Sequence, residues 1–131
     1  MRTFPIIALM VVTGAVAAAN PASDGSFVQI VSISPTVGTA LRAGEKVSLK
    51  VEIEYVVPVE SATIGLVVQA ADNSPIANDN DVLLKGSGKV TLTADFTVPA
   101  TKMINIFTPL SAQGQNSTST VDSRAFKVLA N

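Results

Sequence analysis

The sequence predicts an all-β domain, an antiparallel β-sandwich of seven strands with Greek-key connections. Segments 46–55 and 89–98 alternate strictly between apolar and polar residues, the period-2 pattern of strands with one buried and one solvated face. Short β-rich segments separated by turn residues fill the rest of the chain after residue 26, without helical periodicity. A closed β-barrel of similar size is the alternative architecture.

The first three strands are predicted from β-rich segments bounded by Pro, Gly and Asx residues. Segment 27–34 stops at Pro35. Segment 46–55 places its odd-numbered residues, from Val47 to Tyr55, on the core side. Segment 62–69 directs Ile64, Leu66 and Val68 to one face, and Val67 on the other face suggests cover on both sides.

The second half of the chain continues the series. Segment 82–85 is a short strand, and Gly86-Ser87-Gly88 predicts a tight turn into the strand at 89–98. The even-numbered residues of that strand are apolar and face the core. Segments 103–110 and 123–129 are the last two strands.

The start of the chain predicts a cleaved secretory signal peptide over residues 1–19. Arg2 supplies the positive end, 4–16 is mostly apolar, and the small residues that follow fit cleavage after Ala17 or Ala19. The apolar run is shorter than the about 20 residues that a membrane-spanning helix needs. We therefore expect no stable membrane insertion.

Cleavage after Ala19 would leave a disordered linker, 20–26, and one folded domain, 27–131. Without Arg2 this part has eight basic and ten acidic side chains, a net charge of −2, and no basic block. Such a distribution argues against nucleic acid as a partner. The expected location is extracellular, or periplasmic in a Gram-negative bacterium.

Four short motifs follow one another along the domain: Ser34-Pro35, Ala43-Gly44-Glu45-Lys46-Val47, Gly86-Ser87-Gly88-Lys89-Val90-Thr91-Leu92 and Phe96-Thr97-Val98-Pro99. In this order they resemble the immunoglobulin-like and fibronectin type III-like sandwich modules of secreted microbial proteins. The resemblance covers most of residues 26–130 and implies fold rather than function. The chain departs from antibody-type domains because it has no Cys pair, no Trp, and no Tyr in segment 103–110.

The composition excludes the common hydrolytic mechanisms. The chain has no His and no Cys, which excludes Ser-His-Asp, Cys-His and zinc-hydrolase sites. Glu52 and Glu54 share a solvated strand face with Lys50, so they are interpreted as a charged surface. We expect a non-enzyme without catalytic residues. An enzyme that uses carboxylates alone is the remaining catalytic alternative.

Segment 71–81 is the one cluster with metal-like chemistry. Asp72, Asp79 and Asp81, with the neighbouring Asn side chains, are hard oxygen donors that suit Ca²⁺. The same residue types are typical of solvated turns, and the EF-hand pattern is absent. A plain loop is the favoured interpretation and a Ca²⁺ site the alternative. No other cofactor is expected.

Two further features bear on ligands. Asn116-Ser117-Thr118 is a glycosylation sequon, so Asn116 is a glycan acceptor if the source is a eukaryote. Carbohydrate binding would need exposed aromatic rings. The five aromatic residues of the domain are instead interpreted as core: Phe27, Tyr55, Phe96, Phe107 and Phe126.

The sequence therefore favours a secreted, non-catalytic binding or adhesion module that presents loops or an edge strand to a protein partner or cell-surface component. The loops expected at 71–81 and 111–120 are the contact candidates. Two alternatives stay open: a structural or surface-coat component that assembles through its sandwich, and a carbohydrate-binding module.

Overall fold

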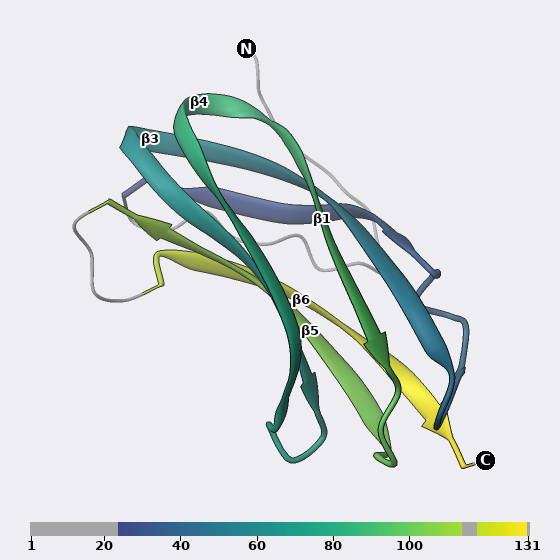
Figure 1. Cartoon of the computed structure of the whole chain (residues 1–131). Helices are drawn as coiled ribbons and strands as arrows, with labels where there is room; N and C mark the ends of the chain where they lie inside the picture. The colour runs from purple at the N-terminus through teal and green to yellow at the C-terminus, as the bar shows by residue number, and fades with distance from the viewer. Residues whose placement is uncertain (1–23, 114–117, 131) are drawn as a thin grey trace.

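The computed structural model describes residues 24–113 and 118–130, and this part of the chain is all-β (Figure 1). None of its residues lies in a helix that is long and apolar enough to cross a membrane. The predicted signal peptide, 1–19, lies outside the described residues. The strands are β1 (Phe27–Ser34), β2 (Leu41–Arg42), β3 (Lys46–Ala70), β4 (Pro75–Thr97), β5 (Met103–Ala112) and β6 (Thr120–Leu129).

β3 and β4 form one long hairpin that runs through two sections of the sheet (Figure 1). In the β1 section, residues 50–56 of β3 pair with β1 on one side, and residues 46–57 of β3 pair with residues 86–97 of β4 on the other. In the β5 section, residues 61–70 of β3 lie between β5 and residues 75–84 of β4. β6 pairs with β5, and β2 adds a short parallel partner to β6. The strand order is β1-β3-β5-β6-β2.

The junction between the two sections lies where Pro58, Val59 and Glu60 of β3 stand opposite Lys85 of β4. Pro58 has no N–H to donate, so it fits an interruption of the hydrogen-bond ladder. Next to Lys85, Gly86 has a φ of +132°, which glycine reaches without the steric cost that other residues meet. Both strands therefore change section at the same level and remain continuous.

This continuity changes the predicted strand count. The strands expected at 46–55 and 62–69 are both part of β3, and those expected at 82–85 and 89–98 are both part of β4. The predicted tight turn at 86–88 is wrong, because these residues pair with Tyr55–Val57 of β3. β2 was not predicted, and its parallel pairing with β6 departs from the all-antiparallel pattern.

One hydrophobic cluster includes buried side chains from both sections. The alternation predicted for 46–55 is confirmed, because its odd-numbered residues from Val47 to Ile53 are buried. Tyr55 is only partly buried. In the β5 section the even-numbered residues of β3 and β5 are buried in the same way. The largest completely enclosed side chain is Phe126 of β6. Consequently the odd-numbered residues of β3 and β5 in this section point away from the core.

Candidate functional site

Asp72, the first of the predicted metal ligands, closes the turn between β3 and β4. Its Oδ1 accepts hydrogen bonds from the backbone N–H of Ser74 at 3.0 Å and from the Ser74 hydroxyl at 2.5 Å. The Ser74 hydroxyl, followed by the Ser74 amide, holds the pKa of Asp72 below its ordinary value. Asn73 between them has a φ of 72°, which Asn tolerates in turns.

Asp79 and Asp81 lie in a strand, so the loop expected over 71–81 is wrong beyond residue 74. Their side chains cap backbone amides of the outer edge of β4. Asp79 Oδ1 accepts from the Asn80 N–H at 2.9 Å, and Asp81 Oδ1 accepts from the Val82 N–H at 2.8 Å. Across residues 24–113 and 118–130, no three acidic, His or Cys side chains gather in a group that could hold a metal ion.

Asp79 also connects the two sections of the sheet. Its Oδ2 accepts a hydrogen bond of 3.1 Å from the N–H of Thr93, which lies in the β1-section part of β4. Because β4 pairs with β3 alone among the described strands, both of its parts are edge strands whose outer amides have no backbone partner in the sheet. The inward-pointing carboxylate of Asp79 therefore closes one side of the domain, where the two edges meet.

The opposite side of the domain is closed in the same way, by residues that belong to no sequence motif. Asp122 of β6 accepts hydrogen bonds from the Ser123 N–H and, across to β1, from the Ile30 N–H, both at 2.8 Å. Arg124 pairs with the Asp122 carboxylate at 3.0 Å and donates to the Ile30 carbonyl at 3.2 Å. Val31 follows as an extra residue in the β1 register, a β-bulge.

The outward side of the β5 section carries almost only uncharged side chains, and we call it the neutral face. Its positions alternate with residues of β3, β4, β5 and β6 that face the core side of the sheet. Lys127, at one end, is its one charged residue. The face consists of Ser61, Thr63, Gly65, Val67, Gln69, Asn78, Asn80, Val82, Leu84, Met103, Asn105, Phe107, Pro109, Ser111, Val121, Ser123, Ala125 and Lys127.

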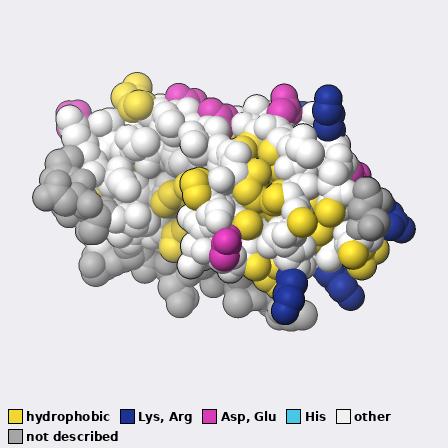
Figure 2. Space-filling model, turned by 60° about the horizontal axis from the view of Figure 1, so that its bottom comes forward, with side chains coloured by type: hydrophobic (Ala, Val, Ile, Leu, Met, Phe, Trp, Pro, Cys, Tyr) yellow, Lys and Arg dark blue, Asp and Glu magenta, His cyan; other side chains and the backbone are white. Residues whose placement is uncertain are grey.

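Apolar side chains lie on all four strands of this face. Val67 of β3 pairs in register with Phe107 of β5, and Pro109 of β5 pairs with Val121 of β6. Val121 is 47% exposed, and Leu84 on β4 is 73% exposed. Figure 2 shows one surface of the molecule on which hydrophobic side chains gather, with an acidic side chain near the middle, further acidic side chains along the upper rim, and Lys and Arg at the right and along the bottom.

Phe107 corrects the expectation that all five aromatic residues belong to the core. Phe96 and Phe126 are buried, but Phe107 alternates with buried Ile106 and Thr108 and points outward, partly covered by its neighbours. The sequence contained a signal for this face, because segment 103–111 has the residue-by-residue alternation of a strand with two different faces. Both faces of that segment are largely apolar, however, so the pattern did not say which one is buried.

The outward side of the β1 section has the opposite character. Charged and hydroxyl side chains alternate there, and Ser32, Lys50, Glu52 and Thr91 line a hollow of about 410 Å³. The Ser32 hydroxyl is 3.4 Å from Glu52 Oε1. This surface matches the solvated face predicted for segments 46–55 and 89–98.

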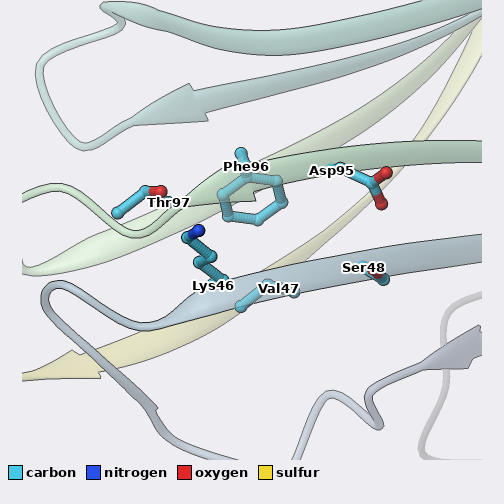
Figure 3. Close-up of a pocket in the computed structure, with 6 residues that line it drawn as sticks. All are labelled: Lys46, Val47, Ser48, Asp95, Phe96 and Thr97. Atoms are coloured by element: carbon cyan, nitrogen blue, oxygen red, sulfur yellow. The ribbon is translucent and has the colours of Figure 1, made fainter.

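A second hollow, of about 380 Å³, lies beside the ends of β3 and β4 and is lined by residues 46–48 and 95–97 (Figure 3). Lys46 pairs in register with Thr97, and Ser48 pairs with Asp95. Figure 3 shows the two pairs at opposite ends of the hollow. Its charged groups, Lys46 and Asp95, therefore do not converge on a common point.

The segment expected as a contact loop at 111–120 is shorter than predicted. Ser111 and Ala112 belong to β5, and Thr120 begins β6. Gln113 is fixed to Ser61 of β3 by a backbone hydrogen bond of 2.9 Å and a side-chain hydrogen bond of 3.0 Å. The predicted glycan acceptor, Asn116, lies outside the described residues.

No family model and no curated protein match the chain. Among solved structures, it is similar to a glycosyl hydrolase family 2 (GH2) member from Bacteroides cellulosilyticus DSM 14838, with a TM-score of 0.54 and 10% identity over 80% of this chain and 15% of that chain. It is also similar to a β-glucuronidase from glycoside hydrolase family 2, with a TM-score of 0.53 and 14% identity over 80% of this chain and 11% of that chain. At these identities the likeness concerns the fold alone, and the chain spans 11–15% of the length of these two enzymes.

Proposed function

We propose that this chain is a secreted, non-catalytic binding or adhesion module, and that it binds a protein partner through the neutral face. The observation that carries this proposal is the contrast between the two outward surfaces. The centres of protein–protein interfaces are depleted of charge and contain aromatic and apolar side chains within a polar rim. The neutral face has this composition, with Val67, Phe107 and Pro109 near its middle.

An immunoglobulin-like sandwich with Greek-key connections is the fold that we propose for the module. The order β1-β3-β5-β6-β2, with β3 and β4 passing from one section to the other, supports two sheets that face each other across one core. The likeness to a small part of each family 2 enzyme is consistent with a compact unit. Because the chain spans so little of those enzymes, their activity is not transferred to it.

The neutral face replaces the edge strands as the preferred contact surface. A peptide that adds to a sheet edge needs free backbone amides. On β4 the amides of Asn80, Val82 and Thr93 are already paired with Asp79 and Asp81. On β1 the Ile30 amide is paired with Asp122. Inward-pointing charges of this kind protect sheet edges from further strands.

A carbohydrate-binding module is the second candidate, and the outward position of Phe107 favours it. Sugar rings stack on aromatic faces, and the amides of Asn78 and Asn105 on the same face can hydrogen-bond to hydroxyl groups. One partly covered ring is a small platform, however. Protein recognition therefore uses more of the neutral face than sugar stacking would.

Capture from the extracellular fluid of the source organism tests the function. The domain is immobilised as wild type and as two variants. Val121→Glu places a charge on the neutral face. Val56→Glu, the matched control, places a charge at an exposed valine of the β1 section. We expect wild type and Val56→Glu to retain the same protein, and Val121→Glu to lose it. Retention by all three contradicts the neutral face as the binding site, and release by neutral polysaccharide favours the carbohydrate alternative.

Export is a separate part of the proposal and has its own test. The expected signal peptide predicts that the protein recovered outside the cytoplasm begins at Ala18 or Asn20, depending on the cleavage site. N-terminal sequencing of the exported protein measures this directly. A mature protein that still begins at Met1 would contradict cleavage.

A further inference from the structure

We propose that the neutral face binds the neutral face of a second copy of this chain, so that two modules recognise each other in a face-to-face homodimer. The inference rests on the proposed function, because it names a partner for the same surface. Four observations support it: the charge of the face, its exposed apolar area, its size, and the closure of the sheet edges.

The charge pattern makes the neutral face compatible with itself. In a dimer with two-fold symmetry each residue faces the same patch on the other copy, so like charges near the centre would repel. The neutral face carries only Lys127, at its end beside Met103. On the β1 section, by contrast, Lys50 and Glu52 would lose their hydration on pairing, a cost that ion pairs often do not recover.

Exposed apolar side chains concentrate on this face. Within the described part of the chain, four of the six large apolar side chains that are exposed lie there: Val82, Leu84, Met103 and Val121. The other two, Val31 and Val56, lie in the β1 section. Burial of these four side chains against an apolar partner surface is favourable because it removes them from water. The same face on a second copy supplies such a surface.

The size of the face sets the strength to expect. Four strands spaced by about 4.8 Å, over nine residues of β3 and β5 and seven of β4 and β6 that rise about 3.3 Å each, give a surface of roughly 19 Å by 26 Å, or about 500 Å² per copy. Stable dimers bury about 800 Å² per partner, and transient complexes bury less. We therefore expect a reversible dimer that depends on concentration.

Closure of the edges leaves the face as the route to association. Asp79 and Asp122 hold edge amides on opposite sides of the domain, which disfavours growth of the sheet by strand addition. Two sheets can still pack face to face, about 10 Å apart and with strands inclined by about 30°. Such packing uses side chains alone and leaves every backbone hydrogen bond in place.

Sedimentation velocity of the mature chain from about 10 to 500 µM tests the proposal. Wild type and the Val56→Glu control are expected to shift from monomer to dimer. Val121→Glu and Leu84→Glu are expected to weaken the dimer about tenfold or more, since each buries two symmetry-related carboxylates in the interface. Leu84, 73% exposed, tolerates substitution without loss of core packing, and circular dichroism checks that all variants fold.

Two outcomes overturn the proposal: a wild-type monomer over the whole range, or a dimer that the Val56→Glu and Val121→Glu variants form equally. Dimerisation should also persist as NaCl rises from about 0.1 to 1 M, because no charge pair holds the interface. Dissociation by salt would contradict the proposal.

Failure of the dimer is distinguishable from failure of the proposed function. A module that stays monomeric but loses its captured partner on Val121→Glu keeps the proposed function and loses only the homodimer.

Discussion

The carboxylate of Asp122 accepts a hydrogen bond from the backbone amide of Ile30, 92 residues earlier in the chain, at a distance of 2.8 Å. Asp79 makes the equivalent bond to Thr93, on the other side of the domain. In both aspartates the other carboxylate oxygen accepts a hydrogen bond from the backbone amide of the following residue. Two aspartates thus join strand edges that no backbone hydrogen bond connects.

Asp122→Ala is expected to lower the free energy of unfolding by about 2–3 kcal/mol, because it leaves the Ile30 amide without its hydrogen-bond partner and removes the carboxylate that pairs with Arg124. Urea denaturation measures the change. Asp81→Ala is the control, because Asp81 accepts a hydrogen bond only from the neighbouring amide. This substitution should cost less than about 1 kcal/mol. Equal losses in the two variants would show that the bond across to β1 contributes little.

Asp79→Ala is expected to expose the Thr93 amide to solvent. The carboxylate is its hydrogen-bond partner across the edge of β4, so amide hydrogen exchange at Thr93 should accelerate by about tenfold or more. NMR-detected exchange measures this residue by residue. The Ile30 amide, on the far side, serves as internal reference and should keep its rate; a uniform acceleration would instead indicate global destabilisation.

Gly86→Ala is expected to destabilise the domain by about 1–3 kcal/mol. Gly86 has a φ of +132°, a region in which a side chain is strained, although the space around its Cβ position is empty. Gly38→Ala is the matched control because Gly38 has open space and no positive φ. Chemical denaturation compares the two, and a Gly86→Ala domain as stable as the control would contradict the strained bend.

Phe126→Ala and Phe107→Ala should differ in cost, although both replace a phenylalanine in neighbouring strands. Phe126 is completely buried, and its loss should cost about 3–5 kcal/mol. Phe107 points outward and is only partly covered, so we expect about half of that or less. Urea denaturation of both variants tests the assignment of Phe107 to the neutral face, which fails if the order is reversed.

The turn at Asp72 is expected to depend on acid pH. Hydrogen bonds from Ser74 favour the carboxylate and hold the pKa of Asp72 below its ordinary value of 3.8. Their contribution is therefore complete above the ordinary value and is lost as the pH falls through the lowered one. NMR titration of the carboxyl carbon should show this pKa rising toward 3.8 in Ser74→Ala; an unchanged midpoint would exclude the Ser74 hydroxyl as the main cause.

The sequence predicted the inward faces of segments 46–55 and 89–98 because strict alternation leaves one choice of side. It did not predict the first part of β4. The run from Asn78 to Asp81 has low strand propensity and is typical of a loop, yet it pairs with 64–67 of β3. That pairing depends on tertiary contacts with a buried strand, which local propensity does not contain.

The candidate surface was harder to find than the fold. Its residues are spread over four strands, and none belongs to a recognised motif. Phe107 lies in a segment that is apolar on both faces, so the strand period could not distinguish core from surface. Asp79 was singled out for metal chemistry, and only the three-dimensional arrangement shows that Thr93 occupies one of its oxygens.

The shared hairpin has a consequence for cooperativity. β3 and β4 cross the junction at Pro58–Glu60 and Gly86 without a break, so each section contains part of the same two strands. Neither section can detach from the other by releasing a connecting loop. Opening one of them must strip hydrogen bonds from strands that the other still holds, so the amides of both sections should share a single opening transition and a common exchange free energy.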